Sequence, residues 1–394
     1  MIDAILTLNS GSSSIKFALF EADGGSDIPR IVGKIRGIGT QPVFAAVGAD
    51  GHPLAPDGLA RIDAGGGHDT LIGALLGWID NHDDGFRLVM AGHRVVHGGR
   101  TYMGPVEINR DIVADLARLA PLAPMHQPHS LAAIKAMAAA SPGLRQIACF
   151  DTSFHRTQPS VAQSFALPRH LTEAGVLKYG FHGLSYEYIA SVLPEQMPTV
   201  AAGRVVVAHL GSGASLCAMK DRCSVATTMG FTALDGLVMG RRPGRLDCGV
   251  VLYLLQDMGM SPADVQHLLY RQSGLLGVSG ISNDMRVLLG SSDPAARAAI
   301  DLFCYRAASE LAGLCVALGG LDGIVFTAGI GENAPEIRKR ICNQLEWMGV
   351  VLDETANAAG EARISAVSSK VTVHVIATNE ELVIARAARG ALNN

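Results

Sequence analysis

Three short segments rich in glycine and small polar residues could bind the phosphates of a ligand. They are NSGSSSIK (9–16), HLGSG (209–213) and GIGEN (329–333). Each follows an apolar, β-rich run, and backbone N–H groups in such a turn can converge on an anion. The first segment is not a Walker A loop, which would need G-x-x-x-x-G-K-[ST] leading into a helix. One such turn could equally be an exposed hairpin, but three together favour a nucleotide site.

Four further segments place charged residues beside glycine or aromatic neighbours. Arg94 lies in GHRVVHGG, Asp151 in FDTSFH, His182 in KYGFHG and Arg242 in MGRRPGRLD. Phosphoryl transfer spreads negative charge over equatorial oxygens, so the protein must supply positive groups and positioning. One arginine can clamp a carboxylate while a second neutralises the migrating group, and carboxylates hold Mg²⁺ through its waters. These residue types therefore indicate phosphoryl transfer chemistry.

Some of these residues also have a structural explanation. Asp151 alone could be a helix cap, and we expect Arg241 and Arg245 to be surface or ion-pair residues rather than catalytic ones. Closely spaced histidines could resemble metal ligands, but no third ligand follows at a fitting spacing. We expect packing and hydrogen bonding for most of these histidines, which are His93, His97, His126 and His129.

The elements that must position these groups repeat along the chain. Residues 4–20 and 204–219 both predict a strand, a polar turn and a returning strand, while 323–340 predicts a strand that leads into a helix. The same hairpin in each half indicates an internally duplicated architecture. Helices are expected at 111–119, 128–140 and 294–318, and from Ser261-Pro262 onward. Residues 20–70 have linker composition and predict a variable excursion.

The composition limits the class of protein. With 394 residues and 48% hydrophobic residues, the chain is long enough for two domains, and a boundary near residue 150 is expected. A formal net charge of −4 without a basic block argues against nucleic-acid or membrane partners. The N-terminus lacks the layout of a signal peptide, and seven scattered cysteines favour reduced, buried thiols. We expect a cytoplasmic enzyme without a structural metal.

Many separate blocks, in order, resemble the acetate kinase family over essentially the whole chain. They are NSGSSSIK, GHRVVHGG, PLAPMHQP, FDTSFH, KYGFHG, HLGSG, TMGFTALDGL, SGLLGVSGISNDMR, FTAGIGENA and ATNEELVIA. The resemblance implies an α/β, duplicated actin-like (ribonuclease H-like) ATPase fold with a central active-site cleft. It implies an N-terminal domain at 1–150, completed by the C-terminal helix 382–394, and a nucleotide-binding domain at 151–381. It also implies a homodimer that uses Mg²⁺, or Mn²⁺, with ATP and acetate.

The resemblance assigns roles to individual residues. Asp151, His182 and Arg242 would be catalytic, with His182 stabilising the transition state, and Asn9 and Glu380 would bind the metal. The acyl group would be bound by Arg94, Val96, Met125, Phe181 and Ala233. The nucleotide would be bound by Lys16, His209, Leu210, Gly211, Ser212, Gly213, Asp284, Met285, Arg286, Gly329, Ile330, Gly331, Glu332 and Asn333. We expect Asp151 to organise Mg²⁺ and its waters, because a carboxylate nucleophile needs no general base.

The chain departs from the family pattern at several positions. Ser212 replaces a usual asparagine, Ala233 a proline and Met125 a leucine, while Arg241 and Arg245 add positive charge to one loop. Losing the proline bulk should enlarge the acyl pocket slightly, and methionine can adapt to its ligand. Two alternatives to an acetate kinase therefore stay open. One is a kinase for a larger acid such as propionate, and the other is a non-catalytic ATP-binding switch on the same fold.

Overall fold

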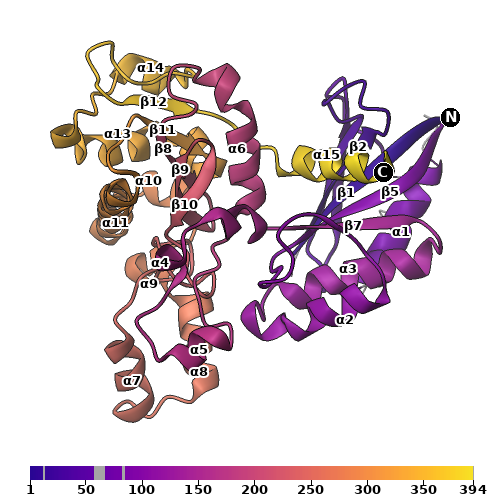
Figure 1. Cartoon of the computed structure of the whole chain (residues 1–394), viewed down its shortest axis with the longest axis horizontal. Coiled ribbons are helices and arrows are strands. Elements are labelled where there is room, and N and C mark those ends of the chain that lie inside the picture. The colour runs from indigo at the N-terminus through magenta and orange to yellow at the C-terminus, as the bar shows by residue number, and fades with distance from the viewer. Residues whose placement is uncertain (12–13, 57–66, 82–84, 394) are drawn as a thin grey trace. The chain divides into compact units, whose positions relative to one another are not determined.

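The computed structural model describes residues 1–11, 14–56, 67–81 and 85–393. The chain divides into two compact units (Figure 1), each described by itself below. Unit 1 comprises Met1–Phe154 and Asn379–Asn394, and unit 2 comprises His155–Thr378. The division lies a few residues from the predicted domain boundaries, so Asp151 and Glu380 belong to unit 1. Asp151 directly follows the strand Arg145–Phe150 of unit 1, and Glu380 begins the helix Glu380–Leu392, which also belongs to unit 1.

Unit 1 is built on a seven-stranded sheet in the order β4-β3-β2-β1-β5-β7-β6. Its strands are β1 (Ile2–Ser10), β2 (Ser14–Glu21), β3 (Ile31–Arg36), β4 (Val43–Gly48), β5 (Phe86–Val95), β6 (Val106–Glu107) and β7 (Arg145–Phe150). The strands from β4 to β1 pair antiparallel, whereas β1, β5 and β7 are parallel. The predicted hairpin at 4–20 is confirmed, although Ser12 and Ser13 of its turn lie outside the described residues.

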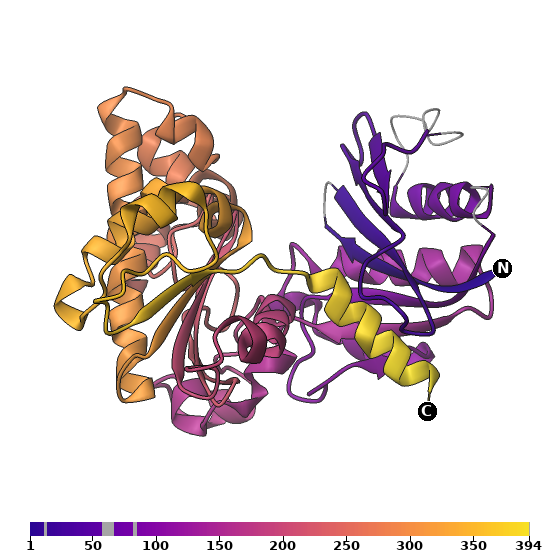
Figure 2. The ribbon, with the colours of Figure 1, turned by 90° about the horizontal axis from the view of Figure 1, so that it is seen from above.

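Helices cover both faces of this sheet. α1 (His68–Asn81) and α3 (Gln127–Ala140) pack on one face, and α15 (Glu380–Leu392) packs on the other, where Ala388 joins a core cluster with Ile5, Met90 and Ile147. Figure 2 shows α15 lying along the sheet of unit 1. The remaining helices are α2 (Arg110–Arg118), capped by Asn109, and the 3₁₀ turn Ala120–Leu122.

The segment predicted as a variable excursion is in part regular structure. Residues 31–48 form β3 and β4, which extend the sheet, so that part of the prediction is wrong. The alternating burial of IVGKIR fits a strand with one face on the core. Gly33 is required there because a Cβ atom at its position would lie 2.1 Å from the Phe17 ring. Residues 57–66 of the same segment lie outside the described part of the chain.

Unit 2 repeats this design with a five-stranded sheet in the order β10-β9-β8-β11-β12. Its strands are β8 (Arg204–Leu210), β9 (Ala214–Lys220), β10 (Cys223–Thr227), β11 (Gly323–Thr327) and β12 (Thr372–Val375). Strands β10, β9 and β8 pair antiparallel, and β8, β11 and β12 are parallel. This matches β3-β2-β1-β5-β7 of unit 1 in order and direction, so the predicted internal duplication is confirmed.

The helices of unit 2 are mostly short. They are α4 (Ser160–Gln163), α5 (Arg169–Glu173), α6 (Gly183–Gln196), α7 (Cys248–Gln256), α8 (Pro262–His267), α9 (Gly274–Ser279), α10 (Met285–Leu289), α11 (Pro294–Leu318), α12 (Ala328–Asn333), α13 (Pro335–Asn343) and α14 (Glu354–Ala359). Shorter helical turns lie at Leu268–Gln272 and Glu346–Met348, and another, Ser153–Thr157, spans the boundary between the two units. The helix predicted at 294–318 is confirmed, and α8 begins with the Ser261 cap and a capping box.

Two further predictions concern the chain as a whole. Of the seven cysteines, all free thiols, five are buried as expected, whereas Cys223 and Cys248 are exposed. Both exposed cysteines begin an element, a strand or a helix, at the surface of unit 2. Within the described ranges, no helix combines the length and the apolar character that crossing a bilayer would need.

Candidate active site

The β1–β2 hairpin of unit 1 places Asn9 directly across from Lys16. Residues opposite each other on antiparallel strands share one face of the sheet, so the two side chains leave the hairpin on the same side. Lys16 is exposed. The pKa of Glu381 is raised by burial and by its neighbour Glu380, and Lys16 and Arg94 partly offset this rise. The end of the hairpin therefore lies beside the start of α15.

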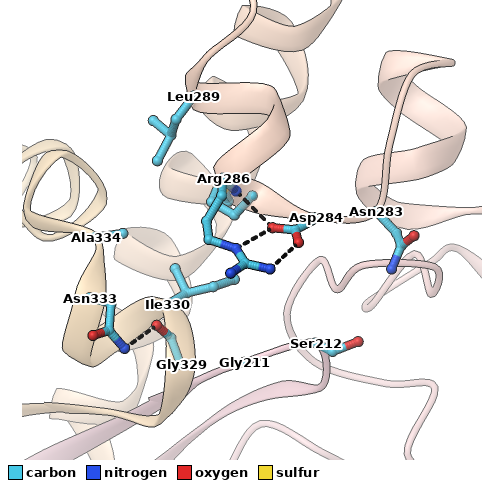
Figure 3. A pocket seen from close by; sticks show the side chains of 11 residues that line it. Gly211, Ser212, Asn283, Asp284, Arg286, Leu289, Gly329, Ile330, Asn333 and Ala334 are labelled. Atoms are coloured by element: carbon cyan, nitrogen blue, oxygen red, sulfur yellow. Dashed lines mark hydrogen bonds and ion pairs between the residues drawn. The ribbon is translucent and has the colours of Figure 1, made fainter. Parts of the chain in front are cut away.

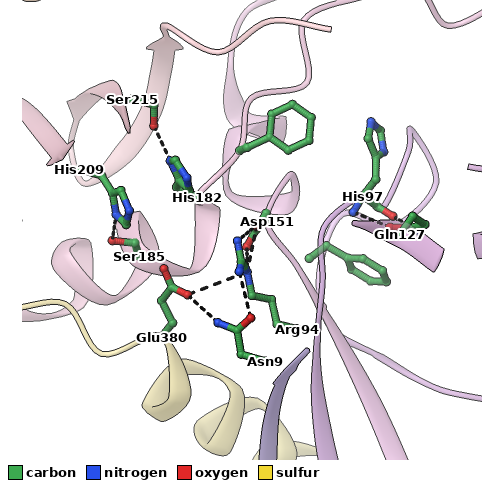
Figure 4. Close-up of polar contacts among 12 residues, drawn as sticks. Asn9, Arg94, His97, Gln127, Asp151, His182, Ser185, His209, Ser215 and Glu380 are labelled. Carbon is green, nitrogen blue, oxygen red and sulfur yellow. Dashed lines mark hydrogen bonds and ion pairs between the residues drawn. The ribbon is translucent and has the colours of Figure 1, made fainter. Parts of the chain in front are cut away.

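Arg94, on β5, is the centre of a polar cluster in unit 1 (Figure 4). Its Nε atom lies 3.0 and 3.1 Å from the two carboxylate oxygens of Asp151, and its Nη2 atom lies 2.5 Å from Oδ2. Asp151 follows β7, the strand parallel to β5, so the two residues leave the same edge of the sheet. The Asp151 side chain is only 1% exposed. Both oxygens of Asp151 thus accept from Arg94, which orients the guanidinium.

The electrostatic surroundings of Arg94 are strongly negative. Burial lowers the pKa of its guanidinium, but Asp151 and Glu380 outweigh burial and raise the pKa well above its usual range. The Arg94 Nε atom lies 3.9 Å from Glu380 Oε2, and Arg94 Nη1 donates to Asn9 Oδ1 at 3.0 Å. The Arg94 side chain keeps 21% of its surface exposed. It is therefore permanently charged, fixed in direction and still accessible to a ligand.

Asn9 and Glu380, the predicted metal ligands, lie next to each other. Asn9 Nδ2 donates to Glu380 Oε2 at 3.4 Å, while the Asn9 oxygen accepts from Arg94. The described residues contain no group of three acidic, histidine or cysteine side chains that could cage a metal. Mg²⁺ commonly keeps several waters and binds one or two carboxylates plus phosphates. Glu380 fits such a site directly, and the Asn9 oxygen, which has two lone pairs, could take part while it accepts from Arg94.

His182 of unit 2 is held in an unusual position. It precedes α6 with φ 60° and ψ 25°, a left-handed conformation that is uncommon outside glycine, asparagine and aspartate. Its Nδ1 atom lies 2.8 Å from Ser215 Oγ, and its ring stacks on His209 with centroids 4.2 Å apart (Figure 4). His209 Nδ1 in turn lies 2.8 Å from Ser185 Oγ. The sequence interpretation missed Ser215 and Ser185.

Arg242 meets His182 over the HLGSG turn. A Cβ atom at Gly213 would lie 2.9 Å from Arg242 Nη2 and 3.2 Å from His182 Nε2, so a side chain there would crowd both groups. Arg242 Nη1 donates to the Ala233 carbonyl at 2.6 Å. Burial lowers the pKa of the Arg242 guanidinium to about 10, and Tyr270 acts in the opposite direction. Arg242 therefore remains charged at neutral pH and points toward Gly213 with His182.

The other two arginines of this loop behave as expected from the sequence. Arg245 is exposed and lies 3.3 Å from Glu310, and Arg241 is exposed. The loop itself is held by backbone bonds, in which Ser273 donates to the Arg241 carbonyl and Gly240 donates to the Ser212 carbonyl. The added charge of Arg241 and Arg245 thus lies at the surface of unit 2.

A cavity of about 660 Å³ in unit 2 lies beside the same turn (Figure 3). Eight residues predicted to bind nucleotide line it: Gly211, Ser212, Asp284, Met285, Arg286, Gly329, Ile330 and Asn333. Asn283, Leu289 and Ala334 also line it and were missed. Asn283 belongs to the SGISNDMR block and directly precedes Asp284, so its position beside a residue predicted to bind nucleotide could have indicated it. The volume is suitable for a small-molecule ligand.

The GIGEN segment differs from the predicted glycine turn. It forms the short helix α12, and a separate helix, α13, begins at Pro335. Glu332 is directed back into the fold, where its carboxylate accepts from Ala328 N at 2.7 Å and Thr378 N at 3.2 Å. The Glu332 carboxylate thus accepts hydrogen bonds from backbone N–H groups that have no carbonyl partner within a helix, and these contacts are structural. Glu332 is not among the residues that line the cavity, and neither are His209, Leu210, Gly213 and Gly331.

Besides Arg94, the other four residues predicted to bind the acyl group are divided between the units. Val96 and Met125 belong to unit 1, where Val96 is buried and Met125 is half-buried. Phe181 and Ala233 belong to unit 2, where Phe181 is buried and its carbonyl lies 2.9 Å from His155 Nε2. In unit 2 both lie next to catalytic candidates, since Phe181 precedes His182 and the Ala233 carbonyl accepts from Arg242.

His97 and His129 have structural partners, which agrees with what we expected for most of these histidines. The His97 backbone N–H donates to Gln127 Oε1 at 3.1 Å, and the His97 ring accepts from Gly99 N at 2.9 Å. His129 stacks on His68, with ring centroids 5.3 Å apart, and burial lowers the pKa of His93 to about 4. These contacts support packing and hydrogen bonding rather than metal ligation.

The two sheets with their shared strand order, and a cavity at a strand–turn–strand hairpin, define a duplicated, two-domain α/β fold of the actin-like ATPase class. The sequence profile of the acetokinase family matches residues 4–386, and the chain belongs to this family. The predicted resemblance is thereby confirmed.

The relatives are similar over their full lengths. An acetate kinase of Rhodopseudomonas palustris (strain TIE-1) is 55% identical over 391 residues, covering 98% of both chains. An acetate kinase of Rhizobium meliloti is 48% identical, covering 98% of this chain and 97% of its own. The solved propionate kinase of Francisella tularensis is 36% identical with a TM-score of 0.90, covering 98% of this chain and 99% of its own. The acetate kinase of Porphyromonas gingivalis is 32% identical with a TM-score of 0.87, covering 99% and 100%.

Proposed function

We propose that this protein is an acetate kinase, which transfers a phosphoryl group reversibly from ATP to acetate and gives acetyl phosphate and ADP. The observation that carries the proposal is the meeting of Arg242 Nη2 and His182 Nε2 at Gly213. Two such donors suit the charge that develops on a migrating phosphoryl group. The full-length similarity to acetate kinases supports acetate as the acceptor.

Unit 1 contributes the group that binds the acceptor. Arg94 uses three N–H groups on Asp151 and Asn9, and a guanidinium has five. The other two can donate to a carboxylate such as acetate. A carboxylic acid with a pKa of about 4.3 is already ionised at neutral pH, so the nucleophile needs no general base. Asp151 then serves as the residue that orients Arg94, in place of the role in organising magnesium that we expected from the sequence.

Unit 2 contributes the groups that bind the nucleotide and the migrating phosphoryl group. The cavity lined by Ser212, Asp284 and Asn333 would take the nucleoside part of ATP. Arg242 and His182 would stabilise the equatorial oxygens during direct in-line transfer. Glu380 would anchor Mg²⁺ with Asn9 close by, and the ion would neutralise phosphate charge when bound. Lys16, exposed at the hairpin end, would act as a point charge near the phosphates.

A propionate kinase is the second candidate. It is favoured by the similarity to the propionate kinase of Francisella tularensis and by Ala233 in place of the usual proline. Loss of that bulk should leave room for one more methylene, which a hydrophobic pocket can discriminate by about 10- to 200-fold. The two candidates differ in acceptor and share every other role described above.

The test is to incubate the purified protein with Mg-ATP and hydroxylamine and to measure acyl hydroxamate from acetate, propionate, butyrate and formate. Preference for acetate supports the first candidate, and preference for propionate supports the second. Absence of hydroxamate with every acid, from protein that still binds ATP, would contradict both and favour a non-catalytic ATP-binding switch.

Other properties remain predictions of the resemblance and the sequence. We propose a homodimer that uses Mg²⁺, or Mn²⁺ in its place, in the cytoplasm, without nucleic-acid or membrane partners. Sedimentation of the purified protein would test the oligomeric state. Titration of apo protein with each metal in the presence of ATP would test the metal.

A further inference from the structure

The histidine that meets Arg242 at Gly213 is supported by a chain of buried hydroxyl groups. His182 Nδ1 lies 2.8 Å from Ser215 Oγ, and Ser215 Oγ lies 2.5 Å from the Tyr186 hydroxyl oxygen. Ser215 and Tyr186 are both fully buried. Ser215 is the second residue of β9, just after the HLGSG turn, and Tyr186 on α6 lies four residues after His182, the residue that precedes this helix. The three polar groups therefore come from the two elements that frame the candidate phosphoryl site.

The direction of these hydrogen bonds follows from the chemistry of the groups. A phenol O–H is more acidic than a seryl O–H, so it is the better donor and the poorer acceptor. The favoured order is therefore Tyr186 donating to Ser215, and Ser215 donating to His182 Nδ1. Burial raises the pKa of Tyr186 well above its usual value, so Tyr186 retains its proton. Hydrogen bonds in such a chain polarise one another and strengthen the order.

This order fixes the state of the imidazole. If Nδ1 accepts, a neutral imidazole must carry its proton on Nε2. Nε2 is the atom directed at Gly213, beside Arg242 Nη2. A second positive charge there would be opposed by Arg242 at close range. The stacked ring of His209, held by Ser185, limits rotation of the His182 ring.

We propose that Ser215 and Tyr186 are positioning residues that hold His182 as a neutral imidazole with its proton on Nε2, so that His182 donates an N–H toward the site at Gly213. Without Ser215, the imidazole would be free to place its proton on Nδ1 and would present a lone pair to negative oxygens. The kinetic consequence rests on the proposed function, whereas the tautomer does not.

The tautomer is measured by ¹⁵N NMR on protein labelled at histidine nitrogens, with His182→Gln used to assign the signals. We expect protonated Nε2 and an accepting Nδ1 at His182 in the unmodified protein at neutral pH. In Ser215→Ala, the signals should move toward a mixture of tautomers or toward protonated Nδ1. Finding His182 as imidazolium or with protonated Nδ1 in the unmodified protein would overturn the proposal, and so would a Ser215→Ala variant with an unchanged tautomer.

Kinetics provide an independent measurement on the same variants. Ser215→Ala should lower kcat about tenfold with little change in KM for ATP, since one oriented donor is lost at the transition state. Ser215→Thr keeps the hydroxyl and should restore most of the rate. Tyr186→Phe should lower kcat about threefold, and it keeps the proposal testable if Ser215→Ala does not fold. An unchanged kcat in both variants would contradict the proposal.

A matched control is available on the same unit. Tyr179 is buried like Tyr186, and its hydroxyl donates to the Gly175 carbonyl at 2.9 Å. Tyr179→Phe removes the same atom without touching Ser215, so the His182 tautomer and kcat should stay unchanged. If the protein forms no hydroxamate with any acid, the proposed function fails while the NMR result still decides the tautomer.

Discussion

Two candidate arginines, Arg94 in unit 1 and Arg242 in unit 2, lie in opposite electrostatic surroundings. Arg94 is bonded to Asp151 and lies near Glu380, which together raise its pKa. Arg242 donates to a neutral carbonyl, forms no ion pair with any residue that the structure describes, and has a pKa lowered by burial. The positive charge of Arg94 is thus already balanced by carboxylates when no ligand is bound, whereas the positive charge of Arg242 is available to interact with an anionic ligand.

One residue type can thus serve two roles in this protein. A guanidinium that is already paired with a carboxylate is held rigidly and interacts only modestly with a further anion. This suits the binding of an acceptor in a fixed direction. A guanidinium that has no carboxylate partner and is partly shielded from water interacts strongly with negative charge that develops during a reaction.

Arg242→Ala should cause the largest loss of activity. Removing a donor that acts mainly in the transition state costs about 10²- to 10³-fold in kcat. Steady-state kinetics should show this loss with KM for acetate nearly unchanged. Arg242→Lys should recover part of the rate, because the charge is kept without the planar geometry. An effect confined to KM would mean that Arg242 binds substrate and transition state equally.

Asp151→Asn should make Arg94 resemble Arg242 by removing its compensating charge. We expect a loss of about 100-fold in kcat/KM for acetate, and a free energy of unfolding lower by about 3 kcal/mol because the remaining charge is partly buried. Urea unfolding and the hydroxamate assay would measure the two effects. The Mg²⁺ concentration for half-maximal rate should stay unchanged, and a large increase in it would support the role that the sequence suggested for Asp151.

Glu380→Gln should weaken the metal response. Loss of the anchoring carboxylate should raise the Mg²⁺ concentration for half-maximal rate by about tenfold. The matched control is Glu381→Gln, on the same turn of α15, which should change this concentration much less. Equal effects of the two substitutions would contradict a specific role for Glu380.

The pH dependence at the alkaline end should depend on Arg242. With a folded-state pKa of about 10, its charge is present below that pH and is lost as pH rises through it. We expect kcat/KM for ATP to fall about threefold between about pH 9.5 and about pH 10.5, since that parameter reports the free enzyme. The residual activity of Arg242→Ala should lack this fall.

Arg245→Ala should have the smallest effect. Arg245 is 71% exposed, and its pair with Glu310 lies at the surface. Exposed pairs contribute about 0–1 kcal/mol to stability. Both kcat and KM should stay within twofold of the unmodified protein. A large loss of activity would mean that the added charge of this loop serves the reaction.

The sequence predicted the parts of the fold that depend on local pattern. Both hairpins and the helix at 294–318 follow from apolar runs, turn residues and caps, which act over a few residues. The strands at 31–48 could not be predicted in the same way. Their glycines and short alternations resemble a linker, and only pairing with β2 and the Phe17 ring over Gly33 makes them part of the sheet.

The candidate site shows the same limit. Family blocks located Arg94, Asp151, His182 and Arg242, but contacts between distant segments decide what each one does. The resemblance assigned Glu332 to the nucleotide site, and no local pattern predicts that its carboxylate accepts backbone hydrogen bonds from Ala328 and Thr378. Ser215 gave no signal of its own, since a serine two residues after a glycine turn is common.

The place of α15 in unit 1 has a consequence for the order of biosynthesis. Its residues cover one face of the sheet and bring Glu380 to Asn9, yet the ribosome translates them after all of unit 2. At about 5–20 residues per second, the nascent strands of unit 1 wait roughly ten seconds or more for this helix. Apolar side chains such as Ile5 and Met90 remain uncovered in that interval. Chaperone capture of stalled nascent chains should therefore concentrate on unit 1 and end when α15 emerges.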